Sequence, residues 1–249
     1  MTKQDLSIDA TVLFAKTTYG EDKTQTAVSV FAHCWAVART AEKIAHKLFQ
    51  DMRGDVIPQD SADIITAIAH AAILSEVIHI KRQTFENVAD VANVQIAAMV
   101  STLSRDIRLV ETKRDIEYRG RLSQSPVATQ IIAVAAIVCT AQEVIKFLED
   151  NAIAAIPKAR KILAQIDGDL LCMHATARYY VLRLYAHAAR NLINDANQMI
   201  KKMKAEARLA RSIEKNTAGL KSREAAKKAA AAAPTDKKEG KRGRKRITD

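Results

Sequence analysis

Glycine and proline are scarce in this chain, which has only 7 and 4 of them among 249 residues. A β-rich fold needs many turns and would use more of both. Alanine, the residue with the best helix propensity, is abundant, and apolar residues recur three and four positions apart. We therefore expect an all-α protein, with helices over about residues 6–18, 28–50, 61–80, 84–104, 111–123, 126–151, 157–166 and 170–217.

Signals for export, membrane insertion and metal capture are also lacking. Residues 1–16 have no cationic start followed by an apolar run, and no stretch reaches ~18 uninterrupted apolar residues. The three cysteines, Cys34, Cys139 and Cys172, are far apart and show no metal-ligand spacing. We expect a cytoplasmic protein without a membrane span, whose cysteines act as small buried hydrophobes.

Familiar catalytic motifs are missing as well. The sequence contains no phosphate-binding or dinucleotide-binding glycine loop, no His-Glu-x-x-His and no Gly-x-Ser-x-Gly. The absence of these motifs gives no support for a nucleoside triphosphatase, a dehydrogenase, a zinc protease or a serine hydrolase.

Positive charge is concentrated at the C-terminal end. The net charge is +11, and residues 201–249 hold 17 Lys and Arg against 6 Asp and Glu, whereas the first 200 residues hold 22 of each. From residue 221 the composition offers almost nothing to bury. We expect a helical domain over 1–168, a long helix over 169–217 that packs on it and then projects, and a disordered tail over 218–249.

Three stretches carry a resemblance to a known family. Residues 31–38 read Phe-Ala-His-Cys-Trp-Ala-Val-Ala, residues 71–80 read Ala-Ala-Ile-Leu-Ser-Glu-Val-Ile-His-Ile, and residues 131–136 read Ile-Ile-Ala-Val-Ala-Ala. Read together, they resemble the HD-domain phosphohydrolase superfamily, most closely the hydrolase domain of RelA/SpoT-type alarmone enzymes. The resemblance covers roughly residues 8–165 and implies an HD-like multi-helix bundle.

The same resemblance implies that most of the catalytic residues are replaced. A family member binds a divalent ion through two imidazoles and two carboxylates, and a further Glu-Asp pair helps to activate water. Here His33 matches the first imidazole, but Ser75-Glu76 stands in place of the His-Asp doublet, His79-Ile80 replaces the Glu-Asp pair, and Ala136 replaces the last aspartate. A hydroxyl is a poor ligand and a methyl is none. We expect no metal, no cofactor and a catalytically inactive pocket formed by His33, Ser75, Glu76, His79 and Ala136.

Two alternatives remain open on these residues. In the first, His33, Glu76 and His79 form an altered site for a divalent metal such as manganese, which would make the protein a nucleotide phosphohydrolase. In the second, Lys23 and the segment 17–26 retain nucleotide binding without hydrolysis, because they lie where the alarmone hydrolases contact nucleotide. An ordinary polar loop is the plainer interpretation of that segment.

The last feature is a dense run of basic residues. Seven cations fall within ten positions: Lys237, Lys238, Lys241, Arg242, Arg244, Lys245 and Arg246. Such cations pair with phosphates without recognising sequence, and no aromatic residue is interleaved for base stacking. We expect contact with nucleic acid or another polyanion here. By contrast, the alternation of Arg105, Arg108, Lys113, Arg114, Arg119 and Arg121 with acidic residues predicts only a solvated helix surface.

Overall fold

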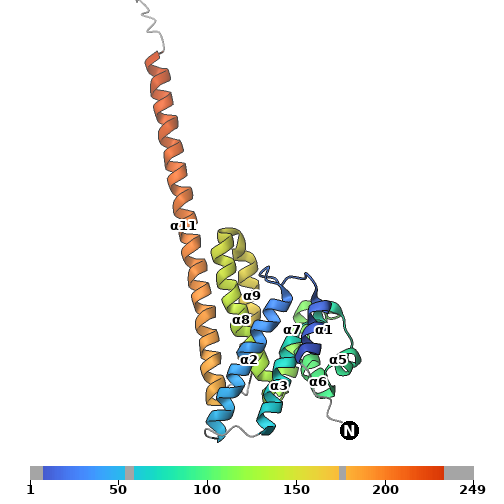
Figure 1. Ribbon diagram of the computed structural model, residues 1–249. Coiled ribbons are helices and arrows are strands. Elements are labelled where there is room, and N and C mark those ends of the chain that lie inside the picture. The colour runs from blue at the N-terminus through green and yellow to red at the C-terminus, as the bar shows by residue number, and fades with distance from the viewer. Residues whose placement is uncertain (1–7, 54–58, 174–177, 233–249) are drawn as a thin grey trace, which may run out of the picture. The chain divides into compact units, whose positions relative to one another are not determined.

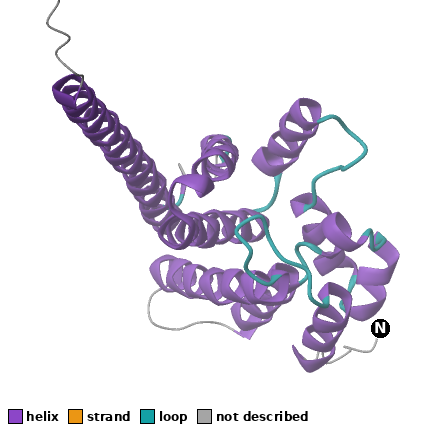
Figure 2. Ribbon diagram, turned by 90° about the horizontal axis from the view of Figure 1, so that it is seen from above, coloured by secondary structure: helices purple, strands orange, loops and turns teal. Residues whose placement is uncertain are grey.

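The computed structural model describes residues 8–53, 59–173 and 178–232. Within these ranges the chain is helical with connecting loops, and its only β pairing is an isolated antiparallel bridge between Lys23 and Ser29 (Figure 2). The expectation of an all-α protein with a long C-terminal helix is confirmed. The chain divides into two compact units, residues 1–203 and 204–249.

The helices of the first unit follow one another closely along the chain (Figure 1). Their bounds are α1 Ile8–Tyr19, α2 Val30–Arg53, α3 Gln59–Ile73, α4 Val77–Lys81, α5 Phe85–Val91, α6 Val94–Leu103, α7 Glu111–Gln124, α8 Val127–Asn151, the 3₁₀ turn Ala152–Ala155 and α9 Ile156–Leu171. The long helix α11, Tyr180–Ala232, runs from the first unit into the second.

Helix α8 supplies much of the core, because its first half is apolar on nearly every face. Residues 129–135 of this helix are all buried, and α2, α3, α6 and α9 pack against it. A helix that is hydrophobic all round belongs inside a bundle. Two helical stretches, Ser61–Lys81 and Val127–Leu171, would be long and apolar enough to cross a bilayer, but at least half of the most apolar part of each is buried in the body.

The expected helix over 61–80 is interrupted, and the side chain of Tyr19 explains where. Helix α3 ends at Ile73 and α4 begins at Val77. The fully buried Tyr19 hydroxyl donates to the Ile73 carbonyl at 2.9 Å and accepts from the Glu76 amide at 3.2 Å. These tertiary hydrogen bonds satisfy backbone groups that a continuous helix would have paired internally. Glu76 at this break and His79 on α4 both line the cavity described below.

Other boundaries also differ from expectation. The predicted helix 84–104 is two helices, since Asn93 caps α6 by accepting from the Ile96 amide at 2.8 Å. Thr84 caps α5 by accepting from the Asn87 amide at 3.2 Å. Before α8, the Ser125 hydroxyl donates back to the Leu122 carbonyl at 2.8 Å, and Pro126 takes the cap position. Gly168 lies inside α9 rather than ending a helix, and α11 begins later and extends further than 170–217.

Candidate functional site

A cavity of about 350 Å³ lies at the position that the sequence motifs indicated. Four of the five residues expected in the pocket line it: His33 from α2, Glu76 from the break after α3, His79 from α4 and Ala136 from α8. The loop before α2 contributes residues 23–26, and α9 closes another side with Gln165, Ile166 and Asp169. The walls therefore mix apolar surface with convergent charged groups, as in many ligand pockets.

His33 is held by a carboxylate that the sequence motifs did not indicate. Its Nδ1 lies 2.7 Å from Glu143 Oε1, and the other oxygen of Glu143 accepts from the Thr26 hydroxyl at 2.8 Å. Thr26 in turn shares a hydrogen bond of 2.8 Å with Thr24. A carboxylate on one ring nitrogen fixes the orientation of an imidazole, so the other nitrogen, Nε2, is left for the cavity.

This pairing shifts the titration of both partners. Burial alone would lower the pKa of His33, but the hydrogen bond and charge of Glu143 raise that pKa above its usual value. Burial would raise the pKa of Glu143, yet the hydrogen bond and charge of His33 lower it. His33 is only 8% exposed, so the pair sits at the buried end of the cavity. The imidazolium–carboxylate form is thus favoured over a wider pH range than for either group alone.

The remaining motif residues are used in other ways. Ser75 does not line the cavity, because its hydroxyl donates to the Ala72 carbonyl at 2.9 Å and also lies 3.8 Å from Cys34 Sγ. His79 Nδ1 lies 3.3 Å from the carbonyl oxygen of Arg105. Cys34 itself is fully buried, and burial raises the pKa of its thiol to about 12, so it is unreactive at neutral pH.

The residues at this position do not fit the divalent metal that the family resemblance implies. His33 can offer an ion its Nε2, but the Ser75 hydroxyl is committed to a backbone carbonyl and Ala136 offers no donor atom. Glu76 and His79 share the cavity with His33. Even so, the described residues contain no cluster of three or more His, Cys, Asp or Glu side chains arranged to hold an ion. A four-ligand site of the family's kind needs such a cluster.

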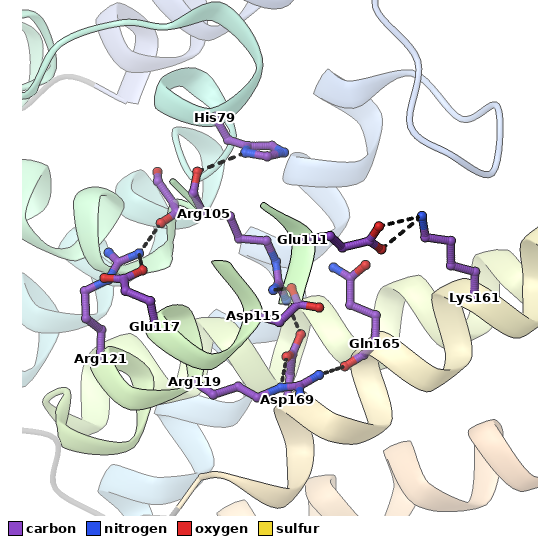
Figure 3. A network of polar contacts seen from close by, with 11 residues as sticks. His79, Arg105, Glu111, Asp115, Glu117, Arg119, Arg121, Lys161, Gln165 and Asp169 are labelled. Atoms are coloured by element: carbon purple, nitrogen blue, oxygen red, sulfur yellow. Dashed lines mark hydrogen bonds and ion pairs between the residues drawn. The ribbon is translucent and has the colours of Figure 1, made fainter. Parts of the chain in front are cut away.

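A charged network around Arg105 and Asp169 forms part of the cavity wall (Figure 3). Arg105 forms ion pairs with Asp115, at 2.6 Å, and with Asp169, and its guanidinium lies 4.0 Å from the centre of the Tyr118 ring. Arg119 binds the second oxygen of Asp169 at 3.0 Å. Burial raises the pKa of Asp169, and the two arginines oppose that shift. The network ties α7 to α9 and fixes the shape of this wall.

Arg105 corrects the expectation of a solvated surface over this segment. Its side chain is 13% exposed, whereas that of Arg108 is 86% exposed and fits the expectation. The alternation of charge in the sequence does not show which arginine is buried, because both have acidic neighbours. Glu143 and Asp169 were missed for a related reason. Each lies on a helix that carries other acids, Glu149 and Asp150 on α8 and Asp167 on α9, so the sequence alone does not single out the two acids that line the cavity.

The loop before α2 contributes to the cavity. Lys23, Thr24, Gln25 and Thr26 all line the cavity, and Lys81 on α4 anchors this loop through an ion pair of 2.8 Å with Asp22. The seven tail cations between Lys237 and Arg246 lie outside the described residues.

The fold is similar to that of a known hydrolase. The chain resembles the solved structure of a metazoan ortholog of SpoT that hydrolyzes ppGpp and plays a role in starvation responses. The TM-score is 0.55 at 11% sequence identity, over 76% of this chain and 96% of that chain. The body has an HD-domain-like fold. At this identity the likeness shows the fold alone. No family model and no curated protein matches the sequence.

Proposed function

We propose that this protein is a catalytically inactive HD-like domain that serves as a binding module, with a basic tail that contacts nucleic acid or another polyanion. The observation that carries the first half is the loss of two ligand positions beside a cavity of about 350 Å³: the Ser75 hydroxyl donates to the Ala72 carbonyl, and Ala136 has no donor atom. A cavity of this size suits a small ligand. Without a tightly held ion there is no strong Lewis acid and no bound water of lowered pKa.

A nucleotide is the ligand that best matches the cavity. Lys23 offers an ammonium and Gln25 a side-chain amide for phosphate or ribose, and both residues line it. The module would then sense a nucleotide without turning it over. Thermal unfolding with guanosine and adenosine nucleotides tests this. We expect a ligand-dependent rise in Tm that Lys23→Ala abolishes and that Lys43→Ala, at an exposed position on α2, leaves intact.

The alternative function is metal-dependent nucleotide hydrolysis with altered ligands, and the likeness to a structure described as hydrolyzing ppGpp favours it. Metal analysis of the purified protein and a manganese-supplemented ppGpp hydrolysis assay separate the two functions. If the domain is inactive, the purified protein should contain less than one metal ion per chain and should not hydrolyse ppGpp. Stoichiometric metal, together with turnover that His33→Ala abolishes, would overturn our proposal.

The tail is tested by truncation. Removing residues 233–249 deletes the seven cations from Lys237 to Arg246. If about six of these charges meet phosphates, we expect the slope of log K for duplex DNA against log salt to become less negative by about 5, at roughly 0.9 per phosphate contact. Unchanged binding would refute the tail contact.

The three cysteines form no disulfide, which fits the reducing environment of the cytoplasm, where we place the protein.

A further inference from the structure

A row of four cations runs along the second unit, on the described part of α11 that begins at Lys204. Lys204, Arg208, Arg211 and Lys215 are spaced by four, three and four residues. At about 100° per residue these side chains leave the helix within an arc of about 60°, over a length of about 17 Å. We call this row the cationic stripe.

The cationic stripe is not neutralised by the protein itself. Arg208, Arg211 and Lys215 are exposed and Lys204 is half-buried. None of the four forms an ion pair or hydrogen bond with the side chains of the described residues. The nearest acids along the helix, Glu206 and Glu214, project about 60° or more outside the arc. A rigid line of a single charge sign therefore faces solvent.

The small number of large apolar residues argues against a membrane as the partner. Leu209, Ile213 and Leu220 are each more than half exposed. They cluster about 150° around the helix from the centre of the cationic stripe. An interfacial helix also places cations opposite its apolar face, but three large apolar side chains over 12 residues offer little area for insertion. The chain also has no aromatic residue after Tyr185 to anchor a helix at an interface.

The geometry points to the phosphate backbone of a duplex nucleic acid as the partner of the cationic stripe, bound without regard to sequence. Over about 17 Å a duplex carries about ten phosphates on its two strands, one per 1.7 Å of axis, which exceeds the four cations of the row. The absence of aromatic side chains removes the base stacking that single-strand binding uses. Because the helix already holds the row straight, binding orders less of the chain than binding by a flexible tail does. This inference extends the polyanion contact of the proposed function.

The test compares two triple variants of the full chain that remove the same charge. Arg208→Gln/Arg211→Gln/Lys215→Gln removes three cations of the stripe, and Lys221→Gln/Lys227→Gln/Lys228→Gln removes three exposed cations about 80° or more outside its arc. Fluorescence anisotropy with a labelled duplex DNA of about 20 base pairs, at several salt concentrations, gives the slope of log K against log salt. We expect the stripe variant to weaken the slope by about 3 and the control variant by less than about 1.

Each other result counts against the inference. Equal effects of the two variants would mean that DNA responds to total charge, and an unaffected stripe variant would exclude the stripe. Binding to phosphatidylserine vesicles but not to duplex DNA would assign the stripe to membranes. If truncation at residue 233 abolishes binding while the stripe variant binds like the wild type, the tail contact stands and the stripe contact fails.

Fold integrity is checked separately. Glutamine is a good helix former, so far-ultraviolet circular dichroism should be unchanged in both variants. Arg208→Lys/Arg211→Lys keeps the charge and should keep the wild-type slope. If this charge-preserving variant lost binding as fully as the glutamine variant, the simple phosphate contact would be wrong.

Discussion

Glu143 Oε1 lies 2.7 Å from Nδ1 of His33, although the two residues are 110 positions apart. His33 is the single imidazole that matches the metal-binding pattern of the family, and here a carboxylate from α8 occupies one of its nitrogens. The pair fixes the orientation of the imidazole in the cavity wall and leaves Nε2 for a ligand. Its energetics can be measured by changing pH.

Glu143→Gln should destabilise the protein most in mildly acidic solution. The folded-state pKa of His33 is raised, so its contribution is full below about 6.5 and is lost as pH rises through the raised value. The folded-state pKa of Glu143 is lowered, so its contribution is full above about 4.5 and is lost as pH falls through the lowered value. Urea unfolding at pH 5.5 should show a loss of about 1–3 kcal/mol that shrinks at pH 8.5.

The control for this experiment is Glu149→Gln on the same helix, where the side chain is exposed. It should change the free energy of unfolding by less than about 0.5 kcal/mol at either pH. A loss in Glu143→Gln that is independent of pH would show that the ion pair does not form.

His70 should lower the stability of the fold in acid, whereas the His33–Glu143 pair contributes most there. It is fully buried, neither ring nitrogen has a hydrogen-bond partner among the described residues, and burial lowers its pKa. The unfolded chain therefore binds a proton more readily, and stability falls as pH drops below about 6.5. His70→Leu should remove part of this loss between pH 7.5 and 5.5 in thermal unfolding. His46→Gln, at an exposed position on α2, should keep it; equal acid sensitivity in His70→Leu would contradict the assignment.

Asp169 should be far more costly to lose than its neighbour Asp167. Asp169 is 5% exposed and binds both Arg105 and Arg119, so Asp169→Ala leaves buried guanidinium charge without its partner. We expect a loss of about 3–5 kcal/mol by urea unfolding. Asp167→Ala breaks a more exposed pair with Arg190 and should cost less than about 1 kcal/mol. Similar losses in the two variants would show that the network does not stabilise the wall.

Two glycine-to-alanine substitutions should have different effects, although both lie inside helices. A Cβ at Gly120 on α7 would meet nothing within 4 Å, so Gly120→Ala should stabilise the protein by about 0.5–1 kcal/mol. A Cβ at Gly168 on α9 would come within 2.6 Å of Arg119 Cζ and displace its guanidinium, which binds Asp169. Gly168→Ala should therefore gain nothing or lose stability in thermal unfolding. An equal gain at both positions would show that Arg119 relocates without cost.

Much of the helical architecture was predictable, because helix periodicity and capping are local properties of the sequence. The apolar run of α8, the cap at Thr84 and the neutral body with its cationic C-terminal end are all visible in the residues themselves. The three motif stretches also indicated the HD-like fold and the position of the cavity before any contact was known.

Only the tertiary structure decided how the cavity is built. The Tyr19 hydroxyl divides one predicted helix into α3 and α4, Glu143 reaches His33 across the bundle, and Arg105 is buried although it alternates with acids in sequence. These outcomes depend on which helix faces meet. A sequence pattern gives the face of each helix but not the partner that covers it, and the burial that shifts a pKa or hides a charge exists only after the helices have packed.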